Sequence, residues 1–512
     1  MISSFVGGRE VVGSAGTFVS TNPARLDEVV AEVSLASADQ LLEAFRVAAA
    51  AQPAWADTPA PVRGRVIAQI GRLVEANAEA LADLIVREVG KPRAEALGEV
   101  QEIVDTCDFF LGEGRRLYGQ TVPSEMRDKQ LFTFRVPVGV AGIITAGNFP
   151  VAVPSWYLVP ALLCGNAVVW KPADYAAALG DALTQIFVAG GVLAGVLNTV
   201  HADGPTTFEG LSLALEAGVV QKVGFTGSSE VGAQIGALCG RHLQSPCLEL
   251  GGKNPLVVMP DADLDLAAEG ALFSGFGTAG QRCTSLGVAI VHDDVYDAFV
   301  ERFVARVEEA VIGDPTGPVL YGPMLSERFL QGFEKWLSEI QPHHTVRGSS
   351  GVGRITADNP REGFVGDPEA GCYAHPTVVL GVTKEDALYR NETFGPLVPV
   401  MRCGSFEEAV SLANGHGYGL SSAIYTGSAQ TAFRFRAKVS AGMLSVNNST
   451  SGAEAHLPFG GNGKSGNGSR QSGVWVLDQF TRWQSMNWDY AGKLQKAQMD
   501  VEVSTADASF RL

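Results

Sequence analysis

A helical pattern of apolar residues runs from about residue 38 to residue 90. Apolar side chains recur there at spacings of three and four residues, which places them along one side of a helix. The stripe consists of Val66, Ile67, Ile70, Leu73, Val74, Leu81, Leu84 and Ile85. The spacing predicts an amphipathic helical region that packs one face against a core.

The segment "DKQLFTFRVPV" at residues 128 to 138 has a different period. Apolar and polar residues alternate along it until Pro137, and a period of two is typical of a strand with one solvated face. A strand at the edge of a sheet also presents backbone groups that another chain can bind. We therefore predict a strand here that pairs with another subunit.

Between residues 138 and 260, short apolar runs alternate with helix-like segments. The runs are "VGVAGIITA", "NAVVWKP", "LNTVHAD", "QKVGFTG" and "NPLVVMPDA". Buried strands separated by helices are characteristic of a parallel sheet with crossover helices. We predict a doubly wound α/β domain of the dinucleotide-binding type.

A second α/β series extends from about residue 264 to 445 and opens with the helical pattern "LDLAAEGALFSGFG". Residues 346 to 372 are rich in Gly, Asp and Pro, which predicts surface loops. The segment "NNSTSGAEAHLPFGGNGKSGNGSRQSG" contains too much Gly, Ser and Asn for a core, and its length predicts a functional loop. Beyond about residue 486 we expect the polar chain to lie on a neighbouring subunit or to fray.

Composition restricts the function classes. A chain of 512 residues exceeds one compact core, so we expect two or three domains. The net charge of −17 argues against nucleic acid as a partner, because nucleic-acid binders cluster Lys and Arg. The first residues lack the pattern of a secretory signal, and the chain has no run of about 18 apolar residues that predicts a membrane span.

The seven cysteines lie at positions 107, 164, 239, 247, 283, 372 and 403, and none forms a C-x-x-C pair. Their odd number and wide spacing argue against a disulfide framework and against a structural zinc site. A reducing, cytoplasmic location is therefore expected.

The stretch "TAGQRCTSLGV" at residues 278 to 288 places Cys283 in a polar, glycine-bounded segment with Arg282 beside it. A thiol becomes a useful nucleophile where backbone N–H groups and a cation favour the thiolate. The isolated stretch leaves three interpretations open: a nucleophile, a metal ligand or a small structural residue. No cluster of His, Cys or carboxylate residues has ligand spacing near Cys283, so no metal is expected.

Two polar residues upstream are candidates for the same chemistry. Glu249, in "PCLELGGKNP", precedes two glycines, and a carboxylate at such a turn can take a proton from water. Asn148, in "ITAGNFPVAVPSW", follows a predicted strand, and its amide can stabilise an oxyanion. Taken singly, each residue is equally well explained as an ordinary turn residue.

Taken together, these segments resemble the aldehyde dehydrogenase superfamily from about residue 20 to 485. The motifs that carry the resemblance are "GNFP", "WKPAD", "FTGSSEVG", "LELGGKNP", "GQRCTS", "NETFGPLVPV" and "PFGGNGKSG". It implies a Rossmann-type, doubly wound NAD domain (residues 1–119 and 139–250) and an α/β catalytic domain (251–447). It also implies a small β arm for oligomerisation (120–138 and 470–495) and a homodimer or homotetramer.

The resemblance implies a role for each candidate. Cys283 attacks the aldehyde carbon to form a thiohemiacetal, and Asn148 with the Cys283 N–H binds the oxyanion. Oxidation leaves a thioester, and Glu249 activates the water that hydrolyses it. Three rivals remain: an acylating enzyme that uses coenzyme A, a non-catalytic protein of this fold, and a cysteine hydrolase. Glu249 argues against the first of these, because it supplies a base for hydrolysis.

The cofactor implied is NAD, with NADP possible. Gly227 and Ser228 lie at a predicted strand-to-helix turn, where helix N–H groups meet a pyrophosphate. A carboxylate at Asp174 accepts ribose hydroxyls and repels a 2′-phosphate, which favours NAD. The full set of cofactor positions that the resemblance implies is Lys171, Asp174, Gly227, Ser228, Thr145, Pro172, Leu250, Glu392 and Phe394.

Within the superfamily, the chain is most similar to the subfamily that oxidises α-aminoadipic semialdehyde (antiquitin). Glu102 is then expected to bind the α-ammonium group, unless it is simply a solvated helix residue. The remaining substrate positions implied are Phe149 and Trp156 around the aliphatic chain, Arg282, Thr284, Gly452 and Ala453 at the α-carboxylate, and Phe459. Glutamate semialdehyde and simple aldehydes are alternatives. Gly147 departs from the family, which usually has a bulky aromatic residue there, and a wider pocket is one expected consequence.

Overall fold

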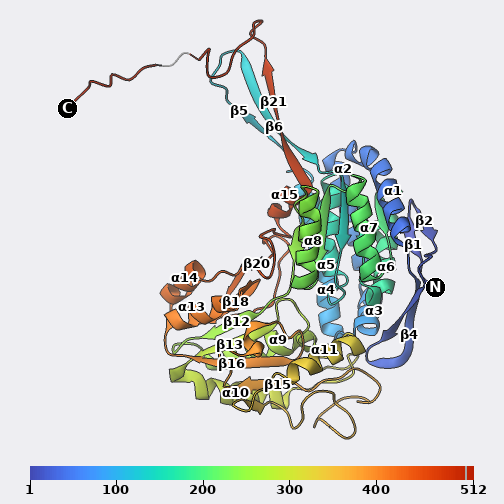
Figure 1. Ribbon diagram of the computed structural model, residues 1–512, viewed down its shortest axis with the longest axis vertical. Helices are drawn as coiled ribbons and strands as arrows, with labels where there is room; N and C mark the ends of the chain where they lie inside the picture. The colour runs from blue at the N-terminus through green and yellow to red at the C-terminus, as the bar shows by residue number, and fades with distance from the viewer. Residues whose placement is uncertain (502–503) are drawn as a thin grey trace.

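The computed structural model describes residues 1–501 and 504–512, and Figure 1 shows two α/β halves with an arm of strands projecting from one of them. The first half is built on a seven-stranded sheet. Five neighbouring strands of this sheet are parallel, and two N-terminal strands extend it antiparallel. The order is β11 (Cys247–Glu249), β10 (Lys222–Thr226), β7 (Val140–Ile144), β8 (Ala167–Lys171), β9 (Leu197–Thr199), β1 (Ser4–Val6) and β2 (Arg9–Val11).

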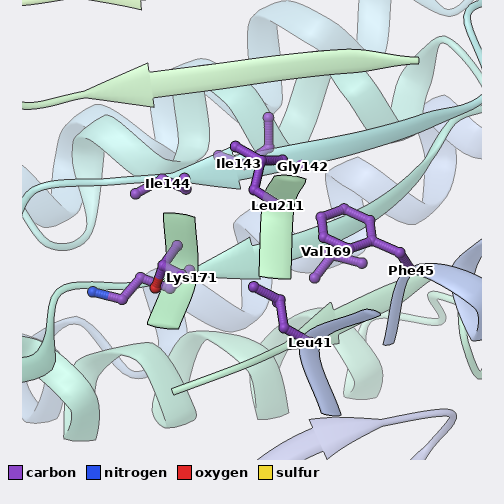
Figure 2. Close-up of a pocket in the computed structure, with 9 residues that line it drawn as sticks. Leu41, Phe45, Gly142, Ile143, Ile144, Val169, Lys171 and Leu211 are labelled. Atoms are coloured by element: carbon purple, nitrogen blue, oxygen red, sulfur yellow. The ribbon is translucent and has the colours of Figure 1, made fainter. Parts of the chain in front are cut away.

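Helices cover both faces of the first sheet, as a doubly wound fold requires. Side chains of α1, α7 and α8 share one apolar cluster with it, and those of α2 to α6 share another. Figure 2 shows Leu41 and Phe45 of α1 facing the strands of Gly142 and Val169, while Lys171 directs its amine away. The helices are α1 (Ala38–Ala56), α2 (Ala60–Ala76), α3 (Ala78–Val89), α4 (Arg93–Glu113), α5 (Ala152–Leu163), α6 (Ala177–Ala189), α7 (Gly204–Glu216) and α8 (Ser229–Arg241).

The helical pattern predicted for residues 38 to 90 is confirmed, but it is divided into three helices. Pro59 lies between α1 and α2, and a proline lacks the N–H that a continuous helix would need. Asn77 separates α2 from α3. Gly90 ends α3 with a left-handed φ of 68°, a conformation that glycine adopts without strain.

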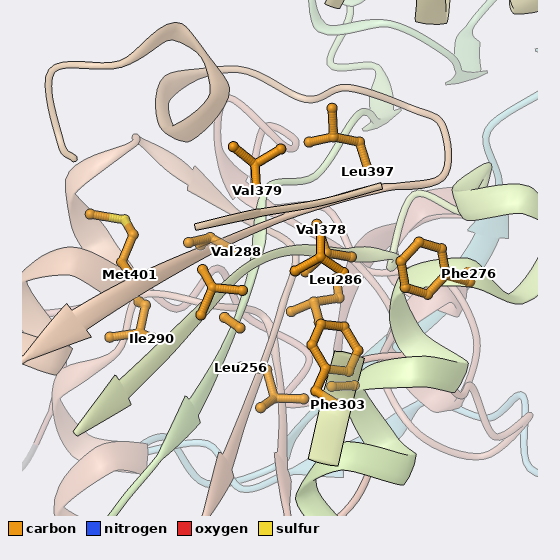
Figure 3. Close-up of a cluster of buried hydrophobic side chains, with 14 of the residues drawn as sticks. Leu256, Phe276, Leu286, Val288, Ile290, Phe303, Val378, Val379, Leu397 and Met401 are labelled. Carbon is orange, nitrogen blue, oxygen red and sulfur yellow. The ribbon is translucent and has the colours of Figure 1, made fainter. Parts of the chain in front are cut away.

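The second half contains another seven-stranded sheet, and Figure 3 shows part of its apolar core. Its order is β14 (Thr345–Arg347), β15 (Thr377–Leu380), β16 (Leu397–Cys403), β13 (Leu286–His292), β12 (Asn254–Val258), β18 (Ser421–Tyr425) and β19 (Met443–Val446). Its helices are α9 (Leu264–Phe276), α10 (Tyr296–Glu309), α11 (Glu327–Leu337), α12 (Ala387–Arg390), α13 (Phe406–Gly415) and α14 (Ala429–Lys438). The described chain between β14 and β15 forms loops, as predicted.

The apolar pattern alone grouped one strand with the first sheet, whereas the domain bounds implied by the resemblance grouped it with the catalytic domain. The run "NPLVVMPDA" forms β12, which pairs with β13 and β18 in the second sheet. The first sheet ends instead at the short strand β11, which pairs with β10. A buried parallel strand has the same continuous apolar pattern in either sheet, so the local sequence does not distinguish them.

The arm consists of β5 (Gln120–Val122), β6 (Lys129–Pro137) and β21 (Thr481–Asp489), with β6 in the middle. The strand predicted at residues 128 to 138 is therefore confirmed as β6. We expected the C-terminal part of the arm from residue 470, but its strand begins at Thr481. Val476 and Phe480, in the short helices η4 (Val474–Val476) and α15 (Leu477–Phe480), are buried with the core of the first half. Beyond Asp489 the described residues form no helix or strand.

The Gly-, Ser- and Asn-rich segment at residues 447 to 473 is partly buried, which corrects its interpretation as too polar for the interior. Ser465 and Gln471 are fully buried. The segment contacts both halves: the Ser465 carbonyl accepts the Leu250 N–H, and Thr450 Oγ1 donates to the Thr284 carbonyl. These two hydrogen bonds tie the segment to both halves, although the buried side chains of Ser469, Gln471 and Ser472 have polar atoms without a partner among the described residues.

The remaining strands form two small sheets, the hairpin β3 (Thr17–Asn22) and β4 (Arg25–Ser34), and the pair β17 (Tyr418–Gly419) and β20 (Asn462–Gly463). Three single turns of helix are η1 (Asp174–Ala176), η2 (Gly277–Gly280) and η3 (Asp293–Val295). Among the described residues, every helix is too short or too polar to cross a membrane.

Candidate active site

A cavity of about 570 Å³ lies between the two halves, at the carboxyl ends of β7 and β10. This is the position at which doubly wound sheets bind ligands. Helix α11 of the second half lines the opposite side with Phe329 and Phe333. The predicted site residues that line the cavity are Asn148, Gly227, Ser228, Leu250, Cys283, Glu392 and Phe394.

Cys283 lies after the single turn η2 and before β13. It is the only partly exposed cysteine, since the other six, all within the described chain, are buried. Burial, together with the charges of Glu392 and Glu249, raises the pKa of Cys283 to about 12. The expectation that its surroundings favour the thiolate is therefore wrong, because they favour the neutral thiol.

Arg282 does not assist this thiol. Its guanidinium Nη2 lies 2.7 Å from Glu95 Oε2, and its Nε donates to Thr278 Oγ1 at 3.1 Å. It also lies over the Phe273 ring, 4.5 Å from the centroid. The side chain is buried and paired, so it is unavailable for the substrate carboxylate that the sequence assigned to it.

Asn148 follows β7 and reaches the segment that carries the thiol. Its Nδ2 donates to the Gln281 carbonyl at 2.9 Å, and both Asn148 and Cys283 line the cavity. The amide is 6% exposed, so the bond forms away from bulk water. Asn148 and Cys283 are 135 positions apart in the sequence, and the structure brings them together in one cavity.

Glu249 ends β11 and is buried at 3% exposure. Its Oε2 accepts the Gly461 N–H at 3.2 Å, whereas its Oε1 has no hydrogen-bond partner among the residues described. Burial raises the pKa of Glu249 well above its ordinary value, although the charge of Arg470 opposes this shift. Burial thus favours the neutral form of this carboxyl group.

The cofactor positions fit a nucleotide at the mouth of the cavity. Ser228 caps α8, where its hydroxyl accepts the Val231 N–H at 3.3 Å, and Gly227 and Val231 line the cavity beside it. The helix N-terminus thus offers backbone donors to a phosphate. Glu392 Oε1 accepts the Gly252 N–H at 3.0 Å, and burial raises the pKa of Glu392 to about 7.

The other cofactor positions lie at the carboxyl ends of β7 and β8. Thr145 is buried, and its hydroxyl accepts the Trp170 indole N–H at 3.0 Å. Pro172 packs against Gly180. Lys171 is buried enough that its pKa is lowered, while the charge of Asp174 opposes this effect. Lys171 and Asp174 are therefore close neighbours at the edge where an adenosine ribose is expected.

The predicted substrate residues form an aromatic wall with a carboxyl group behind it. The rings of Trp156 and Phe459 lie 4.5 Å apart. Glu102 Oε1 and Trp156 Nε1 are both buried, and the Trp156 indole N–H acts to lower the pKa of Glu102 by donating toward its carboxyl group. Burial and the charge of Glu99 raise the pKa of Glu102 to about 8. Glu102 is thus no solvated surface residue.

The other predicted substrate positions surround Cys283. Phe149 and Ala453 are half-buried beside the same apolar cluster as Cys283, and Lys91 Nζ lies 3.5 Å from the centroid of the Phe149 ring. Thr284 Oγ1 donates to Ser451 Oγ at 3.4 Å. Gly452 has a left-handed φ of 131° and open space where a Cβ would lie.

One group of potential metal ligands occurs elsewhere in the described residues. His343, His344 and Asp386 place ligand atoms within 4.8 Å of one another. The Asp386 Oδ2 atom already accepts the N–H and hydroxyl of Thr383, and His344 Nδ1 accepts the Gln341 N–H. These bonds leave His344 Nε2 protonated, so it donates to Asp386. None of the three residues lines the cavity around Cys283.

Comparison with known proteins decides the family. A sequence profile described as the aldehyde dehydrogenase family matches residues 11–486. The chain belongs to this family. It is therefore an NAD(P)-dependent oxidoreductase that acts on an aldehyde.

Similar proteins include several semialdehyde dehydrogenases. The α-ketoglutaric semialdehyde dehydrogenase of Bacillus subtilis is 34% identical over 480 residues, 93% of this chain and 96% of the relative. The α-aminoadipic semialdehyde dehydrogenase of Bos taurus is 34% identical over 492 residues, 95% of this chain and 88% of the relative.

Solved structures share the fold. Betaine aldehyde dehydrogenase of Staphylococcus aureus in complex with NAD+ has a TM-score of 0.90 and 26% identity, and the match covers 96% of both chains. A 3,6-anhydro-L-galactose dehydrogenase in complex with NADP has a TM-score of 0.87 and 32% identity, with 95% of this chain and 99% of the other covered.

The structure explains why residue 147 is a glycine. A Cβ at residue 147 would lie 2.6 Å from Tyr175 Cε2, 2.9 Å from Ala173 Cβ and 3.1 Å from Ala176 Cβ. Tyr175 therefore fills the space that a larger residue would occupy, and its hydroxyl accepts the Gly147 N–H at 3.2 Å. The pocket is not widened at this point, which corrects that expectation.

We expect Gly147→Ala to lower the free energy of unfolding by about 1–3 kcal/mol, because its methyl group overpacks this contact. Urea denaturation measures the change. Gly98→Ala is the matched control: it lies in α4 with open space around the new Cβ, so stability should stay equal or rise. In a Tyr175→Ala background the cost of Gly147→Ala should shrink. An equal cost in both backgrounds would show that Tyr175 does not set the limit.

Proposed function

We propose that this enzyme oxidises a semialdehyde to a carboxylic acid through a thioester on Cys283. The observation that supports it most directly is the hydrogen bond from Asn148 to the Gln281 carbonyl, beside the thiol and within one cavity. The Cys283 thiol loses its proton to solvent, Sγ forms a bond to the aldehyde carbon, and the C=O π electrons move to the oxygen. The oxyanion so formed is stabilised by the Asn148 amide and the Cys283 N–H, both of which are fixed before reaction.

The cofactor would be held by the N-terminus of α8 at its phosphates, by Lys171 and Asp174 at the adenosine ribose, and by Glu392 at the second ribose. Phe394 and Leu250 would border its ring. When bound, NAD(P) supplies a two-electron acceptor. Asp174 favours the cofactor without a 2′-phosphate, because two negative charges would repel each other there.

Glu249 completes the reaction by taking a proton from the water that attacks the thioester. The C–S bond then breaks, the acid leaves and Cys283 regains its proton. Because burial raises the pKa of Glu249, it must first lose a proton, so the rate of hydrolysis should increase with pH.

The preferred substrate we propose is an amino-acid semialdehyde such as α-aminoadipic semialdehyde. Glu102 lies beside Trp156, and its buried carboxyl group can accept an α-ammonium group. Since Arg282 is engaged by Glu95, the α-carboxylate would be bound by Thr284 and the N–H groups of Gly452 and Ala453. Phe149, Trp156 and Phe459 would flank the aliphatic chain.

A second candidate is a 2-oxo acid semialdehyde. It is favoured by the pKa of Glu102, about 8, because a protonated carboxyl group can donate a hydrogen bond to a keto oxygen. The relatives named for α-ketoglutaric semialdehyde point to the same chemistry. A panel of aminoadipic, glutamic, succinic and α-ketoglutaric semialdehydes with propanal, followed by NADH absorbance, separates the candidates. No turnover of any member would contradict the proposed function.

The pH dependence of KM distinguishes the two. An ammonium group requires ionised Glu102, so KM for α-aminoadipic semialdehyde should fall as pH rises from 6.5 through the pKa of about 8. KM for α-ketoglutaric semialdehyde should rise over the same range. Glu102→Gln should remove both dependences and raise KM about 10-fold or more for the ammonium substrate, as expected for losing a charge-assisted hydrogen bond.

Propanal is the internal control for this test, because it has no group for Glu102 to bind. Asp108→Asn, on the exposed side of α4, is the control variant. An equal change in KM for propanal and for both semialdehydes would show that Glu102 does not contact the substrate.

We further propose that the arm binds a second copy of the chain, as a homodimer or homotetramer. β21 is an edge strand, and its Trp483, Met486 and Trp488 are exposed. Exposed apolar side chains along an edge strand are costly unless another chain covers them. The seven free thiols support a reducing compartment, the cytoplasm.

A further inference from the structure

Helix α4 approaches the active site from behind with two buried carboxylates. Glu95 and Glu99 are four residues apart, so they lie on the same side of the helix. Glu99 is fully buried, and the Glu95 side chain is 17% exposed. Carboxylates are rarely buried unless something pairs with them. Each of these two reaches a different segment of the site.

Glu95 binds the turn that precedes the nucleophile. Its Oε2 accepts the Thr278 hydroxyl, its Oε1 accepts the Thr278 N–H at 3.3 Å, and its Oε2 pairs with Arg282 at 2.7 Å. Burial opposes the ionisation of Glu95, but the charge of Arg282 and the Thr278 bond lower its pKa below the ordinary value. The carboxylate is thus charged and holds both ends of the segment from 278 to 282.

This turn has a strained backbone. Thr278 and Ala279 have φ angles of 52° and 54°, and Gly280 follows with 70°. Glycine adopts such angles freely, but a β-branched threonine rarely does. A strained conformation of this kind persists only where surrounding contacts hold it. The hydrogen bonds of Glu95 with the N–H and hydroxyl of Thr278 are contacts that can hold this conformation.

The strained turn determines where the oxyanion groups lie. The Gln281 carbonyl, which accepts the Asn148 amide, follows the turn directly, and Cys283 with its N–H comes two residues later. Gln281 is fixed further because its Oε1 accepts the Leu325 N–H at 3.0 Å. A relaxed turn would therefore displace the Asn148 anchor and the Cys283 N–H together.

Glu99 holds the other side of the oxyanion site. Its Oε1 accepts the Val151 and Ala152 N–H groups at 2.8 and 3.1 Å, at the start of the helix that follows Asn148. Lys91, also fully buried, pairs with its other oxygen. One face of α4 thus contacts the segment of Asn148 and the segment of Cys283.

We propose that Glu95 is a positioning residue that holds the strained 278–280 turn and so fixes the Asn148 amide and the Cys283 N–H relative to each other. Glu95 itself does not touch the substrate. The inference rests on the proposed function, because it concerns the oxyanion formed at Cys283.

The test compares Glu95→Gln with wild type, using NAD+ and propanal, which needs no contact with Arg282 or Glu102. We expect kcat per active site to fall about 10–100-fold, while KM for NAD+ changes less than twofold, as for an interaction made only in the transition state. Active sites are counted by stoichiometric alkylation of Cys283. Asp108→Asn, an exposed residue of the same helix, should keep wild-type kcat.

A second background separates positioning from general destabilisation. Thr278→Gly lets the turn adopt its φ without strain, so Glu95→Gln should reduce kcat much less in that background than in wild type. If Glu95→Gln does not fold, Glu95→Asp, one methylene shorter, replaces it and should show the same dependence on residue 278.

The outcomes are distinguishable. A kcat within twofold of wild type in Glu95→Gln, or an equal loss with Thr and with Gly at 278, would overturn the inference and leave the proposed function intact. A wild-type enzyme that forms no NADH with any aldehyde would instead overturn the proposed function.

Discussion

Cys283→Ala is expected to abolish aldehyde-dependent NADH formation, with kcat at least about 10³-fold below wild type, because no other group can form the covalent intermediate. NADH absorbance with a semialdehyde or propanal measures the loss. Cys403→Ala is the matched control: Cys403 is buried in β16 and lines none of the cavity, so it should keep wild-type kcat. Retained turnover in Cys283→Ala would rule out the thioester route.

The protonation state of the Cys283 thiol can be measured separately, by the rate at which it is alkylated. Because the pKa of Cys283 is raised to about 12, its alkylation by iodoacetamide without cofactor should accelerate about tenfold for each pH unit from 7 to 10 without a plateau. A plateau below pH 9 would show that the thiolate is already favoured. The positive charge of bound NAD+ should increase the rate, since a nearby cation stabilises the thiolate.

Glu249→Gln is expected to separate the two halves of the reaction. Oxidation should still release about one equivalent of NADH per site in a burst, while steady-state turnover falls about 10²–10⁴-fold, the range for loss of a general base. Mass spectrometry should then detect the acyl group on Cys283. Glu301→Gln, exposed on α10, is the control for replacing a glutamate.

Two results would contradict this role. Unchanged steady-state turnover at neutral pH would show that Glu249 is not the base. Loss of the burst along with turnover would place Glu249 before thioester formation instead. In wild type, the steady-state rate should rise with pH, because the raised pKa of Glu249 favours the neutral carboxyl group, which cannot accept a proton from water.

The chemistry of individual motifs was largely predictable from the sequence. Strands β7, β8, β9 and β10 followed from short apolar runs, and β6 followed from its alternation, because these periods reflect burial on one or two faces. The functional motifs lie at strand ends, so Asn148 and Gly227 were expected at one edge of a sheet, and both line the cavity. Local spacing carries this information.

The sequence did not reveal Glu95, Lys91 or Tyr175 as parts of the site. The spacing of Glu95, Glu99 and Glu102 within one helical pattern was a signal that carboxylates share a face. Nothing local indicated that Glu95 would meet Arg282, 187 positions away, and withdraw it from the thiol and from the substrate. The expectation of a favoured thiolate was wrong chiefly because Cys283 is buried, with Glu392 and Glu249 raising its pKa further.

The sequence by itself determined the α/β class, the family motifs and the identity of the reactive groups, because these depend on the order and spacing of neighbouring residues. Only the tertiary structure decided why residue 147 is a glycine and which charges face the thiol. Such properties arise where distant segments pack together, since burial and charge depend on every neighbour in space. The order of residues along the chain does not by itself fix which distant residues become neighbours, whereas the folded structure does.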